Sequence, residues 1–306
     1  MGPALTEAVE PTPARRLLRV VGLVRYRFFL YAGLLPYLLG AAWAHAVDGQ
    51  FEAKAFWSGL FGVVLAVIGV EAFNEYFDAR MGTDRIFNPA DLPPITLAVL
   101  WIGIAAFAGA LAVGIYLTSR GGWPILAFAL LGGAAAIFYE APPIRWSYRG
   151  LGELVIGLSY GPWMVLGSLY LHTGSMSTGA LVASLLPACL IMALAVANAI
   201  PDFHQDRLVG KRNLVVRLGR RRGVALYVSL AAGGFVAVLA GVAAHLLAPT
   251  CLIALLAVPL LALSGRRAQG TCEQPRRFLP AVRALVACYA LGAGLLVLGV
   301  LAGGAV

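Results

Sequence analysis

The sequence predicts an all-α polytopic membrane protein, and three observations lead to that fold class. Of the 306 residues, 60% are hydrophobic and only 12% are charged, roughly half the charged fraction of a soluble domain. The apolar residues form runs of the length that a membrane-spanning helix needs, about 20 residues. The net charge of +9 falls mainly in the segments between these runs. That placement indicates topology control rather than nucleic-acid binding.

Residues 1–16 are polar and contain prolines, so we expect a disordered cytoplasmic tail over residues 1–20, followed by one transmembrane domain over residues 21–306. Small residues recur in the apolar runs, which favours close helix packing. A short Leu-Ala-Pro segment joins the seventh and eighth runs, so these two helices should form a hairpin. We expect nine spanning helices, at residues 27–46, 55–77, 94–117, 123–139, 152–172, 178–200, 223–245, 248–264 and 281–303.

The distribution of basic residues predicts the orientation. Of the 23 Lys and Arg, only Lys54 and Arg120 fall after the first and third predicted spans; the others lie in the N-terminal tail or after even-numbered spans. This alternation places the N-terminus in the cytoplasm. Nine spans would then place the C-terminus outside. Nothing in the pattern specifies an oligomeric state.

The first polar motif is Asn74-x3-Asp78-x5-Asp84, where the second predicted span ends. Asn74 and Asp78 are four residues apart and share a helix face. Gly82 should let the chain turn so that Asp84 comes back beside them. Glu71 lies one turn before Asn74, deeper in the membrane, and has either a structural or a functional role.

The second motif is Asn198-x3-Asp202-x3-Asp206, at the end of the sixth span. The spacing places the three side chains on one helix face, and Pro201 should kink or end the helix. Both motifs share the Asn-x-x-x-Asp core and should lie on the cytoplasmic side of the bundle.

Clustered carboxylates at helix C-termini repel each other and face the negative end of the helix dipole, so a cation should bind there. Mg²⁺ fits, because it uses a few carboxylates together with phosphate oxygens and waters. Nearby basic residues, including Arg207 and Lys211, can neutralise a diphosphate. The combination predicts an amphipathic substrate, with its diphosphate at the cytoplasmic face and an isoprenoid tail among apolar helices.

With these motifs, the sequence resembles the UbiA superfamily of intramembrane prenyltransferases, from about residue 20 onward. The loop Gly-Lys-Arg-Asn-Leu-Val-Val-Arg-Leu-Gly at 210–219 adds to the resemblance. The Asn-x3-Asp-x3-Gly-x-Asp form of the first motif, and Tyr-Arg-Gly-Leu-Gly-Glu at 148–153, resemble most the branch that prenylates 1,4-dihydroxy-2-naphthoate in menaquinone synthesis. The resemblance implies a nine-helix bundle around a central cavity.

By position, the resemblance implies that Asp78, Asp84, Asp202 and Asp206 bind Mg²⁺. Asn74, Asn198 and Lys211 would bind the diphosphate. Arg207, a basic residue beside the second motif, is a further candidate to bind it. Lys211 and Tyr139 would be catalytic, with Tyr139 facing the cavity. Tyr139, Tyr160 and Trp163 are the candidates to stabilise an allylic cation by cation–π contact.

Three positions depart from the naphthoate branch: Pro201 stands where an Arg is frequent, Glu75 where an Asp is frequent, and Tyr26 where a Pro is frequent. These departures leave the aromatic acceptor open. Two further functions stay open as well: a UbiA-type terpene cyclase, which uses no acceptor, and a membrane transporter. The general base is not assigned, and neither is the length of the prenyl chain.

Overall fold

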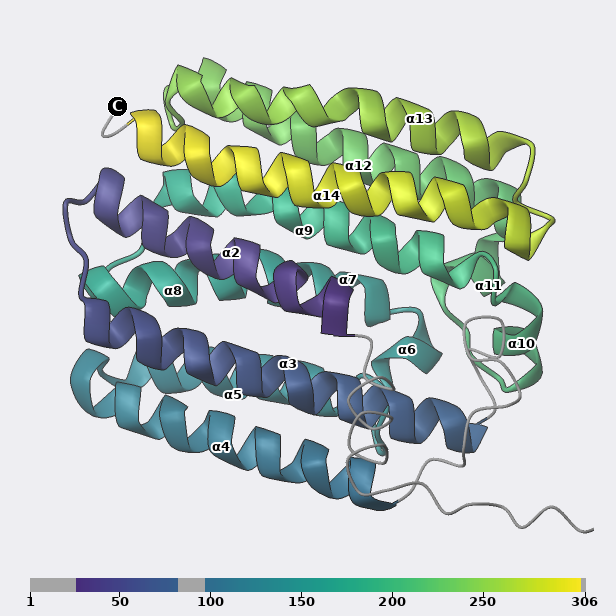
Figure 1. The fold of residues 1–306 in the computed structure, drawn as a ribbon, viewed down its shortest axis with the longest axis horizontal. Helices are drawn as coiled ribbons and strands as arrows, with labels where there is room; N and C mark the ends of the chain where they lie inside the picture. Colours follow the sequence, from purple (N-terminus) through teal and green to yellow (C-terminus); the bar gives the residue numbers. More distant parts are fainter. Residues whose placement is uncertain (1–25, 82–96, 304–306) are drawn as a thin grey trace, which may run out of the picture.

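The computed structural model describes residues 26–81 and 97–303, and for residues 26–31, 78, 79 and 81 it describes the backbone alone. Within these residues every regular element is a helix. The predicted N-terminal tail and Asp84 lie outside the described residues. Figure 1 shows long helices running side by side, while the short helices α6, α10 and α11 gather at one end of the bundle.

The helices follow the predicted runs closely. The first half contains α2 (Tyr26–Ala46), α3 (Ala53–Met81), α4 (Leu97–Gly121), α5 (Trp123–Ile137) and α6 (Trp146–Arg149). The predicted fifth span is built from α7 (Gly152–Leu158), the π-helical segment η1 (Ser159–Trp163) and α8 (Met164–Thr173). The second half contains α9 (Thr178–Ala199), α10 (Phe203–Leu208), α11 (Leu214–Leu218), α12 (Arg220–Ala243), η2 (Pro249–Ala257), α13 (Val258–Gln269) and α14 (Pro275–Gly303).

Helix α9 forms the centre of the bundle. In its most apolar stretch 67% of the residues are buried, more than in any other candidate span of the described chain. It packs against α7, η1, α12 and α14. The predicted hairpin is confirmed, because α12 packs against both η2 and α13. The core around α9 consists mostly of Ala, Leu, Ile and Val side chains, together with aromatic residues such as Tyr227 and Tyr289. The buried hydroxyl of Tyr289 donates to the Ala32 carbonyl oxygen at 2.6 Å.

Among the described residues, seven helical stretches are long and apolar enough to cross a membrane. Helix α5 is apolar but has only 15 residues, roughly 22 Å at 1.5 Å per residue. That is shorter than the roughly 30 Å hydrocarbon core of a bilayer. The polytopic all-α fold is confirmed, whereas the count of nine spans stays a prediction.

Close packing of α2 against α8 depends on Gly40. A Cβ at Gly40 would lie 2.2 Å from the carbonyl oxygen of Val165 and 2.7 Å from Cβ of Ser168. The interface also has a buried hydrogen bond, in which Ser168 Oγ donates to the Tyr37 carbonyl oxygen at 2.7 Å. Neither backbone can move away without separating the two helices.

We therefore expect Gly40→Ala to destabilise the protein by about 1–3 kcal/mol, the range for overpacking a tight interface. Gly233→Ala on α12 is the matched control, because nothing lies within 4 Å of its Cβ position. Ala is the better helix former, so the control should be neutral or slightly stabilising. Thermal unfolding in detergent measures both variants; equal midpoints for the two would contradict the prediction.

Candidate active site

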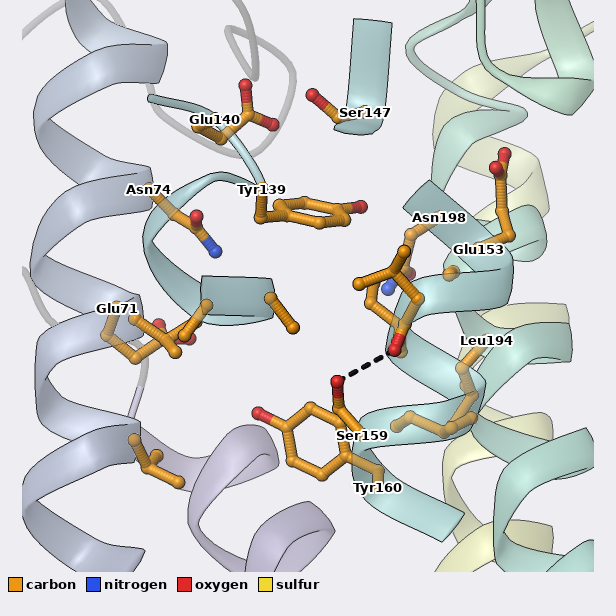
Figure 2. Close-up of a pocket in the computed structure, with 18 of the residues that line it drawn as sticks. Glu71, Asn74, Tyr139, Glu140, Ser147, Glu153, Ser159, Tyr160, Leu194 and Asn198 are labelled. Carbon is orange, nitrogen blue, oxygen red and sulfur yellow. Dashed lines mark hydrogen bonds between the residues drawn. The ribbon is translucent and has the colours of Figure 1, made fainter. Parts of the chain in front are cut away.

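A cavity of about 600 Å³ opens between α3, α5, η1 and α9, at the end of the bundle where the short helices gather. Figure 2 shows Asn74 on one side, Asn198 on the other and the Tyr139 ring between them. The deep part is mostly aliphatic, with Val67, Met164 and Ile191 among its lining residues. The polar residues that line the cavity are Glu71, Asn74, Glu75, Tyr139, Glu140, Ser147, Glu153, Ser159, Tyr160, Asn198, Asp202, Asp206, Lys211 and Asn213.

The second motif reaches this cavity across a break in the chain. Helix α9 ends at Ala199 and α10 begins at Phe203, so the predicted interruption of the helix at Pro201 is confirmed, and the three side chains do not share one continuous helix. Pro201 has no backbone N–H to continue the helix, and this explains the break. The Asp206 N–H still donates to the Asp202 carbonyl oxygen at 2.8 Å, which keeps the two aspartates one turn apart. Asn198, Asp202 and Asp206 all line the cavity as a result.

The first motif lies on the facing wall. Asn74 lines the cavity from the last third of α3, together with Glu75. Asp78 belongs to the last turns of the same helix, but its side chain lies outside the described residues, as does Asp84. The predicted approach of these two carboxylates to the second motif stays a prediction.

Lys211 is held at the cavity by a buried ion pair. Its Nζ lies 3.2 Å from Glu140 Oε1, and the Lys211 and Glu140 side chains are only 9% and 5% exposed. Nζ also lies 5.6 Å from the centre of the Tyr148 ring, within cation–π range. A buried ammonium needs such anionic and aromatic contacts to stay charged. The arrangement places a positive charge where an anionic head group can reach it.

The loop after α10 is fixed to the aspartates by Asn213. Asn213 Nδ2 donates to Asp206 Oδ2 at 2.7 Å, and Asn213 Oδ1 accepts from the Val216 N–H at 2.9 Å, which caps α11. The Lys211 N–H donates to the Asp206 carbonyl oxygen at 2.9 Å. From α7, Glu153 Oε1 accepts the Leu214 N–H at 2.9 Å. One short loop therefore sets the positions of both the ammonium and the Asp206 carboxylate.

Because Asn213 holds the Asp206 carboxylate in place, a substitution at Asn213 tests how precisely Asp206 must be positioned for activity. Asn213→Asp keeps a good helix cap but sets a second carboxylate against Asp206. We expect near-normal thermal stability and a drop of about tenfold in kcat/KM, equivalent to 1.4 kcal/mol of transition-state stabilisation.

The control for this prediction is Ser177→Ala, which removes a cap far from the cavity, where Ser177 Oγ accepts the Ala180 N–H at 3.4 Å. Loss of that cap costs about 1 kcal/mol of stability, and activity should be unchanged. Equal activity in Asn213→Asp and Ser177→Ala would show that Asn213 acts only as a cap.

Most of the predicted site residues meet in this cavity. Asn74, Asn198, Asp202, Asp206 and Lys211 line it, and so do two predicted cation-stabilising residues, Tyr139 and Tyr160. Arg207 is exposed on α10 and does not line the cavity. Trp163, at the end of η1, does not line it either.

Sequence reasoning assigned no role to Glu140, the partner of Lys211. It follows Tyr139 directly, but 71 residues separate it from Lys211, so no spacing rule links the two. Asn213 was part of the quoted loop motif without a role of its own. The sequence does contain an indication of its role as a helix cap, because Asn213 stands immediately before an apolar segment, which is typical of a helix N-cap.

The oxygen donors of the cavity fit a hard cation. Among the described residues no three His, Cys, Asp or Glu side chains lie close enough to hold a metal by themselves. Mg²⁺ needs fewer, since it binds through one or two carboxylates and completes its shell with phosphate oxygens and water. Asp202 and Asp206, 4% and 5% exposed, provide such carboxylates beside Asn198.

The fold and the cavity together describe a polytopic membrane protein whose acidic and amide-lined site lies at the helix ends, above a mostly apolar interior. The chain belongs to the UbiA prenyltransferase family, whose family model matches residues 33–285. It is therefore a prenyltransferase, as the resemblance to the UbiA superfamily implied.

Named relatives agree with this assignment, and solved structures share the fold. The chain is 26% identical over 238 residues to a 1,4-dihydroxy-2-naphthoate octaprenyltransferase of Bacillus subtilis, covering 75% of this chain and 76% of the relative. It is 31% identical over 238 residues to the Mycobacterium tuberculosis protein of the same name, covering 72% and 75%. The fold matches a UbiA homolog from Aeropyrum pernix with a TM-score of 0.68 at 19% identity, over 90% of this chain and 98% of that one.

A UbiA homolog from Archaeoglobus fulgidus, solved bound to GPP and Mg²⁺, matches with a TM-score of 0.53 at 14% identity, over 89% and 98% of the two chains.

Proposed function

We propose that this enzyme transfers a polyprenyl group from a polyprenyl diphosphate to 1,4-dihydroxy-2-naphthoate, with Mg²⁺ as cofactor. One observation carries the proposal: four polar residues lie together at the mouth of a mostly apolar cavity, namely Asn198, Asp202, Asp206 and Lys211. Such a cavity suits a substrate with an anionic head and a long hydrocarbon tail. The acceptor is suggested by the names of the two bacterial naphthoate relatives.

Asp78, Asp84, Asp202 and Asp206 are the proposed metal ligands. Bound Mg²⁺ would supply Lewis-acid neutralisation of the diphosphate. The Archaeoglobus homolog solved with GPP and Mg²⁺ supports this pairing of substrate and metal. In this chain Asn74 and Asn198 face each other across the cavity (Figure 2) and would bind the diphosphate oxygens from both sides.

Lys211 would stabilise the negative charge that develops on the diphosphate as the carbon–oxygen bond breaks. Its ion pair with Glu140 positions the ammonium before substrate arrives. The Tyr139 ring lies between the two walls (Figure 2), where its face can stabilise the allylic cation. The aliphatic residues below exclude water from that cation. Arg207, exposed beside the site, would guide the anionic head by its charge.

We also propose that the site faces the cytoplasm, with the N-terminus inside and the C-terminus outside. Arg207, Arg212 and Arg217 belong to the short helices and loops around the cavity mouth, whereas Lys54 and Arg120 belong to the opposite end. This asymmetry follows the positive-inside rule. In Figure 1, α14 ends on the side of the bundle away from α10 and α11, which supports an outside C-terminus.

A membrane assay tests the proposal, using a labelled polyprenyl diphosphate and 1,4-dihydroxy-2-naphthoate, with and without Mg²⁺. We expect a prenylated naphthoquinol that forms only with the metal. Diphosphate release with a cyclic hydrocarbon product, in the absence of acceptor, would instead identify a terpene cyclase. No consumption of the diphosphate by folded protein would refute both.

A further inference from the structure

We propose that the part of the cavity between Glu71 and Tyr160 is the acceptor subsite, in which these two residues bind a hydroxyl group of the aromatic acceptor and Glu71 takes its proton. This inference rests on the proposed function, because it needs an aromatic acceptor. It assigns the general base that the two polar motifs do not provide.

Glu71 lies in an apolar part of the molecule. It lines the cavity from α3, one turn before Asn74, and is only 7% exposed. The other α3 residues that line the cavity on its deep side are aliphatic. A carboxylate at such a position is costly, and an ionisable residue inside a membrane domain is a functional candidate for that reason. The aliphatic residues on this wall are Val63, Ala66, Val67 and Val70.

Tyr160 approaches from the opposite wall. Figure 2 shows its hydroxyl pointing across the cavity toward α3, where Glu71 and Asn74 project inward. A Cβ on Gly33 would lie 3.6 Å from Tyr160 Cε1 and 3.1 Å from Val67 Cγ2. The edge of the Tyr160 ring is therefore near Val67, one helical turn before Glu71. The two polar groups therefore lie within about one helical turn of each other along α3.

The segment η1 gives Tyr160 this direction. Its backbone departs from helical geometry at Gly161, with φ −112° and ψ −106°, and Pro162 follows. A Cβ at Gly161 would lie 2.3 Å from Ala188 Cβ, so η1 packs directly against α9. Short π-helical segments inside α-helices are frequent at functional sites. Here the segment turns a phenol into the cavity.

The chemistry of this pair fits a hydroxylated ring and not a diphosphate. A carboxylate that binds no metal ion repels an anionic head group but accepts a hydrogen bond from O–H, and a phenol can donate or accept. Lys211, which suits the head group, belongs to the loop at the cavity mouth. The aliphatic walls around Glu71 suit the faces of an aromatic ring. The prenyl diphosphate and the aromatic acceptor would then lie side by side, with C1 of the prenyl chain next to the acceptor ring.

The proposed step balances as follows. The acceptor O–H proton passes to Glu71, and the electron density released into the ring forms the bond to C1 of the prenyl chain. The C1–O bond breaks, and its electron pair leaves with the diphosphate. The attacked ring carbon then loses its substituent, either CO₂ from a carboxylate or H⁺ to water. The ring becomes aromatic again as Glu71 returns the proton to the oxygen.

Glu71→Gln tests the inference, because it keeps the shape of the side chain and removes the base. We expect a fall of about 10²-fold in kcat for transfer, within the range for a general base, and a higher KM for the acceptor. The KM for the prenyl diphosphate and its Mg²⁺-dependent hydrolysis without acceptor should change less than threefold. Glu52→Gln, at the opposite end of the bundle, is the matched control and should behave as the unaltered enzyme.

A methylated acceptor separates the base from a structural role. The O-methyl ether of 1,4-dihydroxy-2-naphthoate has no proton to give at that oxygen, so Glu71→Gln should slow its transfer far less than that of the free naphthol. If Glu71→Gln fails to fold, Tyr160→Phe replaces it, with an expected rise of about tenfold in acceptor KM for the loss of one hydrogen bond.

Two outcomes overturn the inference alone. One is an unchanged kcat and acceptor KM in Glu71→Gln, or in Tyr160→Phe where that variant replaces it. The other is a loss of diphosphate hydrolysis equal to the loss of transfer, which would place Glu71 with the diphosphate. Failure of the unaltered enzyme to prenylate any hydroxylated aromatic overturns the proposed function as well, and is visible without a variant.

Discussion

Asp202→Asn is expected to reduce kcat/KM for transfer by about 10³-fold while the protein still folds. Asp202 is 4% exposed and lines the cavity beside Asn198 and Asp206. Asn has nearly the same volume and keeps one carbonyl oxygen, so packing is preserved. It removes the negative charge that a divalent cation needs, and preorganised charge at a reacting diphosphate lowers the barrier by several kcal/mol.

The measurement is steady-state transfer at several Mg²⁺ concentrations, together with the thermal midpoint in detergent. The midpoint should stay within a few degrees, and excess Mg²⁺ should restore part of the lost rate. Asp48→Asn, exposed in the loop after α2, is the matched control and should retain full activity. Full activity in Asp202→Asn would remove Asp202 from the metal–diphosphate site.

Lys211→Met should have two separable effects. The loss of the ammonium should raise the barrier to diphosphate departure by about 3 kcal/mol, or roughly 10²-fold in kcat. The change also removes the charge that faces Glu140 at 3.2 Å. Breaking a buried ion pair from one side costs about 3–5 kcal/mol of folding stability. Both activity and thermal midpoint should fall.

The double variant Lys211→Met/Glu140→Gln separates the two effects. It removes both charges, so most of the stability should return, while activity should stay at the level of the single variant. Lys54→Met, at the other end of the bundle, controls for the loss of a lysine. Recovery of activity in the double variant would mean that Lys211 acts only by neutralising Glu140.

The sequence predicted the helices well, because their length and apolarity are local properties. The same holds for the motif residues Asn74, Asn198, Asp202 and Asp206, which lie at helix ends where periodicity and a proline already constrain them. Their convergence on one cavity was predictable because both motifs end helices on the same side.

Other features depend on contacts between distant segments. The Lys211–Glu140 pair joins residues 71 positions apart, and neither hydropathy nor spacing links them. The direction of Tyr160 depends on a local departure from helical geometry at Gly161. The exposure of Arg207 depends on how α10 turns after the break at Pro201. None of these three features can be predicted from the regular 3.6-residue period of an α-helix.

The segment η1 has a consequence for how relatives should be aligned. In a regular α-helix each residue rotates the chain by about 100°. The wide π-helical turn of η1 therefore has the same effect as one extra residue inserted into the helix, without interrupting the helix by a loop. Deleting one residue between Ser159 and Trp163 would rotate every side chain of α8 relative to α7. A relative of equal span length but without this wide turn would present a different residue to the cavity at the position of Tyr160. Acceptor preference could therefore diverge through a single insertion or deletion inside a membrane span, with both aspartate motifs untouched.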